Sequence, residues 1–132
     1  MPIIPQWYDE SKTVYLLQFT ADGIQSWDEY RQAIDAALVD IMAVEHPVIV
    51  YFSPDKSPMP PGKPLPHVRD GLRQVPPHVG AVIHLVNNHF AATIMQWLLQ
   101  IGRYRWCHIV SSKQEAEALV ARLKSELQEN GI

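Results

Sequence analysis

Residues 48–52 read Val-Ile-Val-Tyr-Phe, an apolar run that begins directly after Pro47. A strand that is apolar on both faces is covered on both sides and therefore lies inside a sheet. Residues 79–86, Val-Gly-Ala-Val-Ile-His-Leu-Val, repeat this pattern, and His84 is their one polar side chain. Because helices must cover both faces of such a sheet, the two runs predict an α/β fold.

Residues 27–45 precede the first of these runs and are expected to form an amphipathic helix. Ser26 and Glu29 have the spacing of a capping box, in which the serine hydroxyl accepts a hydrogen bond from the backbone amide of the glutamate. Pro47 marks the end of the helix. The side chains that recur at helical spacing on its apolar face are Trp27, Tyr30, Ile34, Ala37, Leu38 and Ile41.

Residues 3–8 and 13–20 are two further strand candidates, joined by the polar residues 9–12. A connection of this length between two strand-like segments predicts a β-hairpin. Alternation along the second strand places Val14, Leu16 and Gln18 on one face and Tyr15, Leu17 and Phe19 on the other.

The second half of the chain supplies three more helices and a last strand. Residues 65–75 and 89–101 are helix candidates, and residues 106–110 are a strand candidate. A second capping box, from Ser112 to Glu115, opens a closing helix over residues 113–130. The resulting order, β-β-α-β-α-β-α-β-α, predicts a mixed, mostly parallel sheet.

Length and composition limit the class of protein. The 132 residues are enough for one ordinary domain, so residues 1–132 are expected to form a single α/β domain. A net charge of −3 argues against a general nucleic-acid binder, since such proteins are usually basic. The single Cys107 excludes an internal disulfide and fits a reducing compartment. The start of the chain lacks the features of a signal peptide, and no apolar run reaches the ~20 residues of a transmembrane helix, so a cytoplasmic location is expected.

The order of elements from the hairpin to the closing helix resembles that of the STAS domain, named for sulfate transporters and anti-sigma-factor antagonists. In that family a serine at the start of a short helix, in an Asp-Ser-Ser-Gly-Leu type motif, is phosphorylated to switch partner binding. Here the short helix contains Asp70-Gly71-Leu72 without the serine pair. The residues that the resemblance leaves as a regulatory loop are Ser53, Asp55, Lys56 and Ser57. It implies a non-enzymatic regulatory or protein-interaction module.

Residues 53–66 are the least regular part of the chain and contain six prolines. They follow a strand of the predicted parallel sheet, and ligands often bind at the carboxyl ends of such strands. Lys56 and Lys63 are candidate residues for binding an anion in this segment. The alternative is a stiff polyproline connection that binds nothing.

Residues 74–102 form a stretch of 29 residues without a single Asp, Glu, Lys or Arg. The helix candidate within it, residues 89–101, has only a narrow polar stripe, whereas a helix packed on one sheet needs only one apolar stripe. The apolar side chains outside that one stripe are expected to be buried under neighbouring helices or to form a protein interface. We predict a homodimer through this helix. The interface residues are Phe90, Ile94, Met95, Trp97, Leu98 and Leu99, with Met95, Trp97 and Leu99 as anchors.

Other candidate sites have simpler explanations. Arg103 and Arg105, beside Tyr104 and Trp106, are able to bind phosphate or bases, but Trp106 is more simply explained as a core residue. The six histidines show no metal-binding spacing, so neither a metal nor another cofactor is expected.

Three functions follow from these observations. The preferred one is the interaction module, which is not an enzyme and binds a protein partner or itself. The second is a carrier of an apolar small ligand or lipid, lined by the 89–101 helix. The third is a small hydrolase with Ser57 or Ser53 as nucleophile and His67 as base, although no Gly-x-Ser-x-Gly motif is present.

Overall fold

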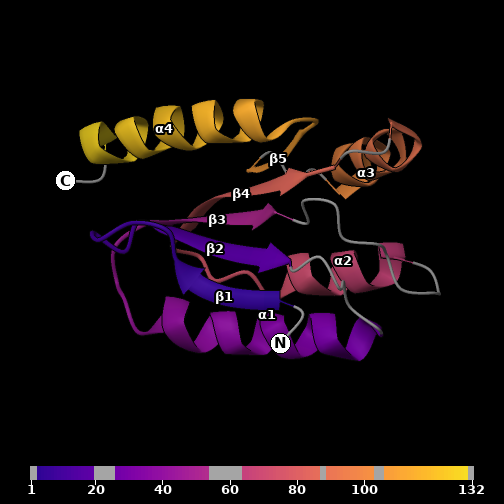
Figure 1. Cartoon of the computed structure of the whole chain (residues 1–132), viewed down its shortest axis with the longest axis horizontal. Helices are drawn as coiled ribbons and strands as arrows, with labels where there is room; N and C mark the ends of the chain where they lie inside the picture. Colours follow the sequence, from indigo (N-terminus) through magenta and orange to yellow (C-terminus); the bar gives the residue numbers. More distant parts are fainter. Residues whose placement is uncertain (1–2, 20–25, 54–63, 87–88, 103–105, 131–132) are drawn as a thin grey trace.

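Five strands form one sheet in sequence order, with four helices packed on it (Figure 1). The computed structural model describes residues 3–19, 26–53, 64–86, 89–102 and 106–130. The elements are β1 (Ile3–Trp7), β2 (Val14–Phe19), α1 (Trp27–Met42), β3 (Val48–Ser53), α2 (Pro64–Arg73), β4 (Val79–Leu85), α3 (His89–Gly102), β5 (Cys107–Val110) and α4 (Lys113–Asn130). The predicted α/β class and order of elements are confirmed.

The first two strands are antiparallel, and every later pair is parallel. Each helical connection therefore moves the chain one strand further in the same direction. Right-handed crossovers of this kind place their helices on one face of the sheet. In the part of the chain that the structure describes, α4, which follows the last strand, packs on the other face against β3, β4 and β5.

The two faces of the sheet carry two separate cores. Val50 and Phe52 of β3 point into the core beneath the crossover helices, whereas Ile49 and Tyr51 point into the core beneath α4. All six residues of β3 are buried, as expected for a strand covered on both sides. In β2, the predicted division between Tyr15, Leu17 and Phe19 on one face and Val14 on the other is confirmed.

The first predicted capping box does not form. Ser26 is the N-cap of α1 with φ −150° and ψ 161°, but its side chain makes no capping hydrogen bond. The helix also ends at Met42 rather than residue 45, because the amide of Ala43 bonds to the carbonyl of Asp40 in a tighter turn.

The second capping box forms in part. The Glu115 amide donates to Ser112 Oγ at 3.1 Å, as predicted. The Glu115 carboxylate reaches one residue further back and accepts from the Ser111 amide at 3.2 Å. These bonds satisfy amides at the start of α4, which anchors it over β3, β4 and β5.

Asp9 holds the turn between β1 and β2 together. One carboxylate oxygen accepts from the amides of Thr13 and Val14 at 2.9 and 3.1 Å. The other accepts from Ser11 Oγ at 2.9 Å and pairs with Lys124 Nζ of α4 at 2.7 Å. Partial burial raises the pKa of this carboxyl, but these hydrogen bonds outweigh it and lower the pKa to about 2. The turn is therefore tied to the closing helix through a charge.

We expect Asp9→Asn to lower the free energy of unfolding at pH 7 by about 1–2 kcal/mol, because it removes a carboxylate that the fold stabilises. The folded-state pKa lies below the ordinary 3.8, so this stability is present above pH 4 and lost as the pH falls towards 2. Chemical denaturation of both proteins at pH 7 and pH 2.5 measures it, and the difference should shrink at the lower pH. The control is Asp35→Asn, an exposed position on α1. Equal losses in the two variants would contradict the assignment.

Candidate functional site

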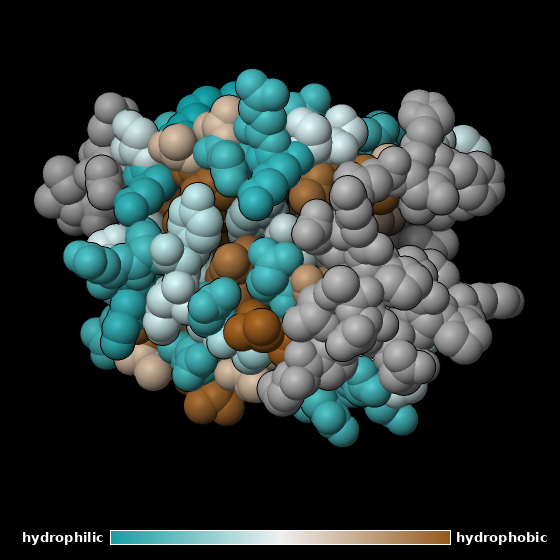
Figure 2. Space-filling model, viewed as in Figure 1, coloured by the Kyte–Doolittle hydropathy of each residue, from teal (hydrophilic) through white to brown (hydrophobic). Residues whose placement is uncertain are grey.

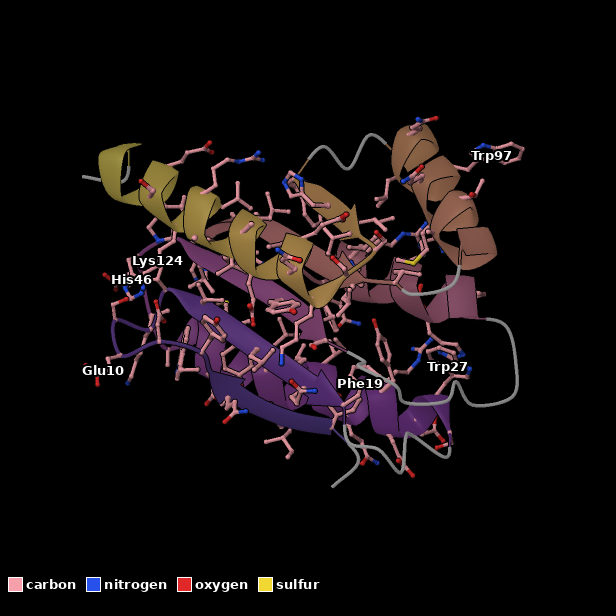
Figure 3. The ribbon with its side chains drawn as sticks, turned by 45° about the horizontal axis from the view of Figure 1, so that its top comes forward. Glu10, Phe19, Trp27, His46, Trp97 and Lys124 are labelled. Atoms are coloured by element: carbon pink, nitrogen blue, oxygen red, sulfur yellow. The ribbon has the colours of Figure 1, made fainter. Side chains whose placement is uncertain are left out.

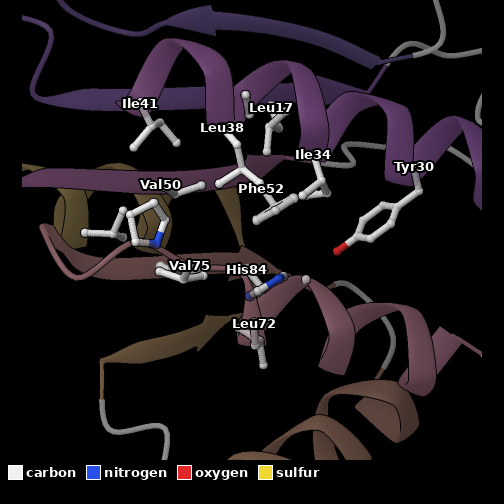
Figure 4. A pocket seen from close by; sticks show the side chains of 15 residues that line it. Leu17, Tyr30, Ile34, Leu38, Ile41, Val50, Phe52, Leu72, Val75 and His84 are labelled. Carbon is white, nitrogen blue, oxygen red and sulfur yellow. The ribbon is translucent and has the colours of Figure 1, made fainter. Parts of the chain in front are cut away.

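A small apolar cavity lies between α1, α2 and the sheet (Figure 4). Its volume is about 40 Å³. Its described lining comes from α1, α2, the segment after α2, and strands β2, β3 and β4: Leu17, Tyr30, Ile34, Ala37, Leu38, Ile41, Val50, Phe52, Gly71, Leu72, Val75, Pro76, Val79, Val82 and His84. None of these side chains is charged at neutral pH, because burial raises the pKa of Tyr30 and lowers the pKa of His84 to about 4.

Gly71 keeps part of this space open. A Cβ placed on Gly71 would lie 3.7 Å from the Tyr30 hydroxyl oxygen, at ordinary contact distance. The absence of a side chain at Gly71 thus leaves room in front of the Tyr30 hydroxyl.

Tyr30 brings a polar group into the apolar wall. Its residue is only 6 % exposed, and its ring stacks on Phe52 with centroids 6.1 Å apart. Burial raises the pKa of the phenol, so the hydroxyl keeps its proton at neutral pH. No described residue forms a hydrogen bond with this hydroxyl, which Figure 4 shows directed towards the middle of the cavity.

His84 and Cys107 form a buried pair beside Phe52. The His84 ring stacks on Phe52 with centroids 4.6 Å apart and an interplanar angle of 4°. Its Nδ1 lies 3.5 Å from the Cys107 sulfur. Burial lowers the pKa of His84 to about 4 and raises the pKa of Cys107 to about 12. The proton therefore stays on sulfur, and the pair is neutral rather than an activated thiolate.

A polar hollow of about 130 Å³ adjoins the cavity at its outer side. Arg31 of α1 pairs there with Asp70 of α2 at 2.9 Å, and its Nε donates to His67 Nδ1 at 3.0 Å. The His67 ring stacks on Trp27 with centroids 4.9 Å apart. Arg31 and Asp70 are 45 % and 34 % exposed, so the pair adds little stability in water. Its main effect is to place polar side chains of α1 and α2 at the outer side of the apolar cavity.

The predicted regulatory loop lies mostly outside the described residues. Asp55, Lys56 and Ser57 are not among them. Ser53 is the last residue of β3 and is only 3 % exposed. Its carbonyl accepts from Gln18 Nε2 at 3.3 Å, which fixes it in the sheet. Burial makes Ser53 a poor target for phosphorylation or for nucleophilic attack.

The predicted anchors of α3 divide between two sides of the helix. Met95 and Leu99 are partly buried against the core beneath the crossover helices. Trp97 is 67 % exposed, and Figure 3 shows it projecting away from the sheet. The side chains of Phe90, Ile94 and Leu98 lie outside those described. Of the three anchors, Trp97 alone is free to meet a partner.

The remaining candidates keep to structural roles where they are described. Trp106 packs against the core as predicted, while Arg103 and Arg105 lie outside the described residues. His46 and His78 hydrogen-bond to backbone carbonyls at 2.7 and 2.9 Å. Among the described residues, no group of three His, Cys, Asp or Glu is placed to hold a metal ion. In the same part of the chain, no helix is long and apolar enough to cross a membrane.

The cavity and its polar groups were not predicted from the sequence. Tyr30 is simply one apolar-face residue of α1 in the helical pattern. The contact between His84 and Cys107 is diagonal, because β4 and β5 pair with Val82 opposite Cys107 and His84 opposite Ile109. Only this register brings the thiol and the imidazole together, and no local sequence signal specifies it.

Comparisons with protein-family models, with curated proteins and with solved structures find no match for this chain. The assignment of a function therefore depends on the geometry described above.

We expect Cys107 to resist iodoacetamide in the folded protein at pH 8, because the thiol is 7 % exposed and protonated. Mass spectrometry should show no alkylation within an hour in buffer and complete alkylation in guanidinium chloride. The denatured sample is the control for reagent activity. Rapid alkylation of the native protein would show a reactive thiolate and would restore Cys107 as a nucleophile.

Proposed function

We propose that this protein is a non-catalytic protein-interaction module that associates with a second copy of itself through α3. The observation that carries the proposal is Trp97, a large apolar side chain that is 67 % exposed on a helix without any acidic or basic residue. Tryptophan is enriched in the energetically dominant positions of interfaces. The single buried Cys107 suits a reducing, cytoplasmic compartment.

Exposure alone does not single out Trp97. Val39 and Met42 of α1 are exposed to 72 % and 63 %, and scattered apolar side chains are normal on protein surfaces. In the view of Figure 2 most of the described surface is hydrophilic, with apolar residues in separate patches. What distinguishes α3 is its surroundings, since α1 carries Asp and Glu residues near its exposed apolar side chains and α3 carries none.

The energetic case follows from the area of the indole. A tryptophan buries roughly 150–250 Å² when fully covered, and two thirds of that at ~25 cal/mol per Å² is worth about 2–4 kcal/mol. In a two-fold symmetric dimer each copy contributes this amount. Met95 and Leu99 on the opposite side fix the helix to its own core, so the surface presented to the partner is held rigidly.

A regulatory role for the loop after β3 is the part of the proposal that the STAS resemblance supports. With Ser53 buried, Ser57 is the serine left for phosphorylation. A phosphate there would add about −1.5 to −2 charges close to Asp55 along the chain. That charge would repel an acidic partner or recruit Lys56.

We expect wild-type protein at tens of micromolar to sediment as a dimer, and Trp97→Lys to sediment as a monomer. The substitution removes the indole and adds a charge to an apolar contact, which should weaken association at least ~30-fold. Sedimentation velocity measures both. Met42→Lys is the matched control, because it places the same charge at an equally exposed apolar position on α1.

A monomeric wild-type protein at this concentration would overturn the homodimer. At a protein concentration low enough for the wild type to be monomeric, thermal unfolding should be nearly unchanged in both variants, since neither side chain is part of the core. A large loss of stability in Trp97→Lys would mean that Trp97 packs within its own chain.

A carrier of a small apolar ligand is the second candidate, and the cavity between α1 and α2 favours it. The expected lining by the 89–101 helix is wrong for this cavity, because its described lining comes from α1, α2 and the strands. At about 40 Å³ it is also much smaller than the ~150 Å³ apolar cavity that holds benzene, which leaves no room for an acyl chain.

Native mass spectrometry of the purified protein tests this candidate. A co-purified molecule of a few heavy atoms, displaced on unfolding, would support the carrier. If the protein is a dimer whose mass is that of two polypeptides, with no bound molecule, the interaction module remains as the function.

A further inference from the structure

We infer that two copies of this chain associate edge to edge through β5, so that their sheets join into one continuous sheet across a two-fold axis. The two β5 strands run antiparallel and pair about His108. This inference rests on the proposed homodimer and specifies the backbone groups that its interface uses.

β5 lies at one edge of the sheet, with β4 on its inner side (Figure 1). The carbonyl of Val110 accepts from the amide of Val86 at 2.9 Å, so the backbone groups of Val110 point towards β4. Along a strand these groups alternate between the two sides, and those of Cys107 and Ile109 therefore point away from β4. In the part of the chain that the structure describes, no backbone hydrogen bond joins this outer row to another segment.

The opposite edge of the sheet, β1, is protected against the same kind of pairing. The Tyr8 amide bonds to the Val14 carbonyl at 2.8 Å, which places the backbone groups of Ile3, Pro5 and Trp7 on the outer side. Proline has no N–H, so Pro5 removes the donor in the middle of this outer row. β5 reads Cys-His-Ile-Val and has neither a proline nor an acidic or basic side chain to protect it. β5 is therefore the edge that a further strand can extend.

A second copy of β5 is the strand that matches these outward groups. In an antiparallel ladder, residue pairs that exchange both hydrogen bonds alternate with pairs that exchange none. With Cys107 opposite Ile109 of the second copy, both symmetry-related pairs are of the hydrogen-bonded kind. His108 then lies opposite its own copy, between them. Every outward N–H and C=O group of residues 107 and 109 is satisfied, because the two-fold axis makes this row complementary to itself.

The position of α3 agrees with this pairing. Joining two sheets edge to edge brings together the helices that flank the joined strands, and α3 is the crossover helix that packs on β5. Since α3 has no acidic or basic residue, two copies of it meet without like-charge repulsion. On the other face α4 carries charges of both signs, among them the Arg122–Glu126 pair at 3.8 Å. The edge of β5 and the surface of α3 thus belong to one interface.

His108→Cys tests the register of the paired strands. Opposite residues of a non-hydrogen-bonded antiparallel pair have Cα atoms about 4.5 Å apart, within the range of about 4.4–6.8 Å found in disulfides. Met42→Cys, at an exposed position of α1, is the matched control, and the wild type shows the background from Cys107. After mild oxidation we expect at least ~10-fold more disulfide-linked dimer for His108→Cys than for Met42→Cys. Gel electrophoresis without reductant measures it, and peptide mapping should find residue 108 joined to residue 108.

Ile109→Pro tests the hydrogen bonds themselves. It removes an outward N–H and leaves the bonds to β4 in place, because the Ile109 amide does not point towards β4. We expect it to weaken association at least ~30-fold in sedimentation velocity. Ile109→Ala is the matched control, since it shortens the side chain but keeps the N–H, and its association should stay within about 3-fold of wild type. If Ile109→Pro does not fold, the cross-link of His108→Cys decides.

The outcomes separate this inference from the homodimer on which it rests. A dimer that Trp97→Lys dissociates, but in which His108→Cys forms no disulfide, would overturn the edge pairing and keep the association through α3. Equal cross-linking of His108→Cys and Met42→Cys would reflect random collision and would also overturn the pairing. A monomeric wild-type protein would overturn both and leave the β5 edge to a strand of another protein.

Discussion

The burial of β3 on both faces is the constraint on which the rest of the structure depends. Its six residues are buried, and its two neighbours are both parallel strands. A strand of this kind is stable only if helices shield both faces from water. Three helices therefore pack on one face, and α4 has to complete the other. The Asp9–Lys124 pair at 2.7 Å then joins the first turn to that last helix.

The face beneath α1, α2 and α3 is where packing is least complete. The helices α1 and α2 lie against each other and against the sheet, and the gap left between them is lined by side chains from both. Gaps larger than a water molecule are few in a well-packed domain. Such a gap costs stability because the side chains that line it lose van der Waals contacts on one side.

The spacing of apolar residues was sufficient to predict the fold, because it shows for each segment whether one face or both faces are buried. The two apolar runs, the division of β2 into faces and the order of elements all came from local pattern. The features that were missed depend on contacts between residues that are far apart in the sequence. The hydroxyl of Tyr30 lies opposite Gly71 of another helix, and His84 meets Cys107 through a register that neither strand specifies alone. Ser26 has the right spacing for a cap but makes no bond.

The charge-free stretch from residue 74 to residue 102 separates into parts with different physical causes. The strand β4 lacks charge because six of its seven residues are buried, with Gly80 exposed. In α3, burial explains Met95 and Leu99 but not Trp97. A solvent-facing helix surface usually carries charged residues, which keep it soluble at little cost in stability. The sequence of α3 itself has no such residue beside its exposed indole, which agrees with the proposed association through this helix.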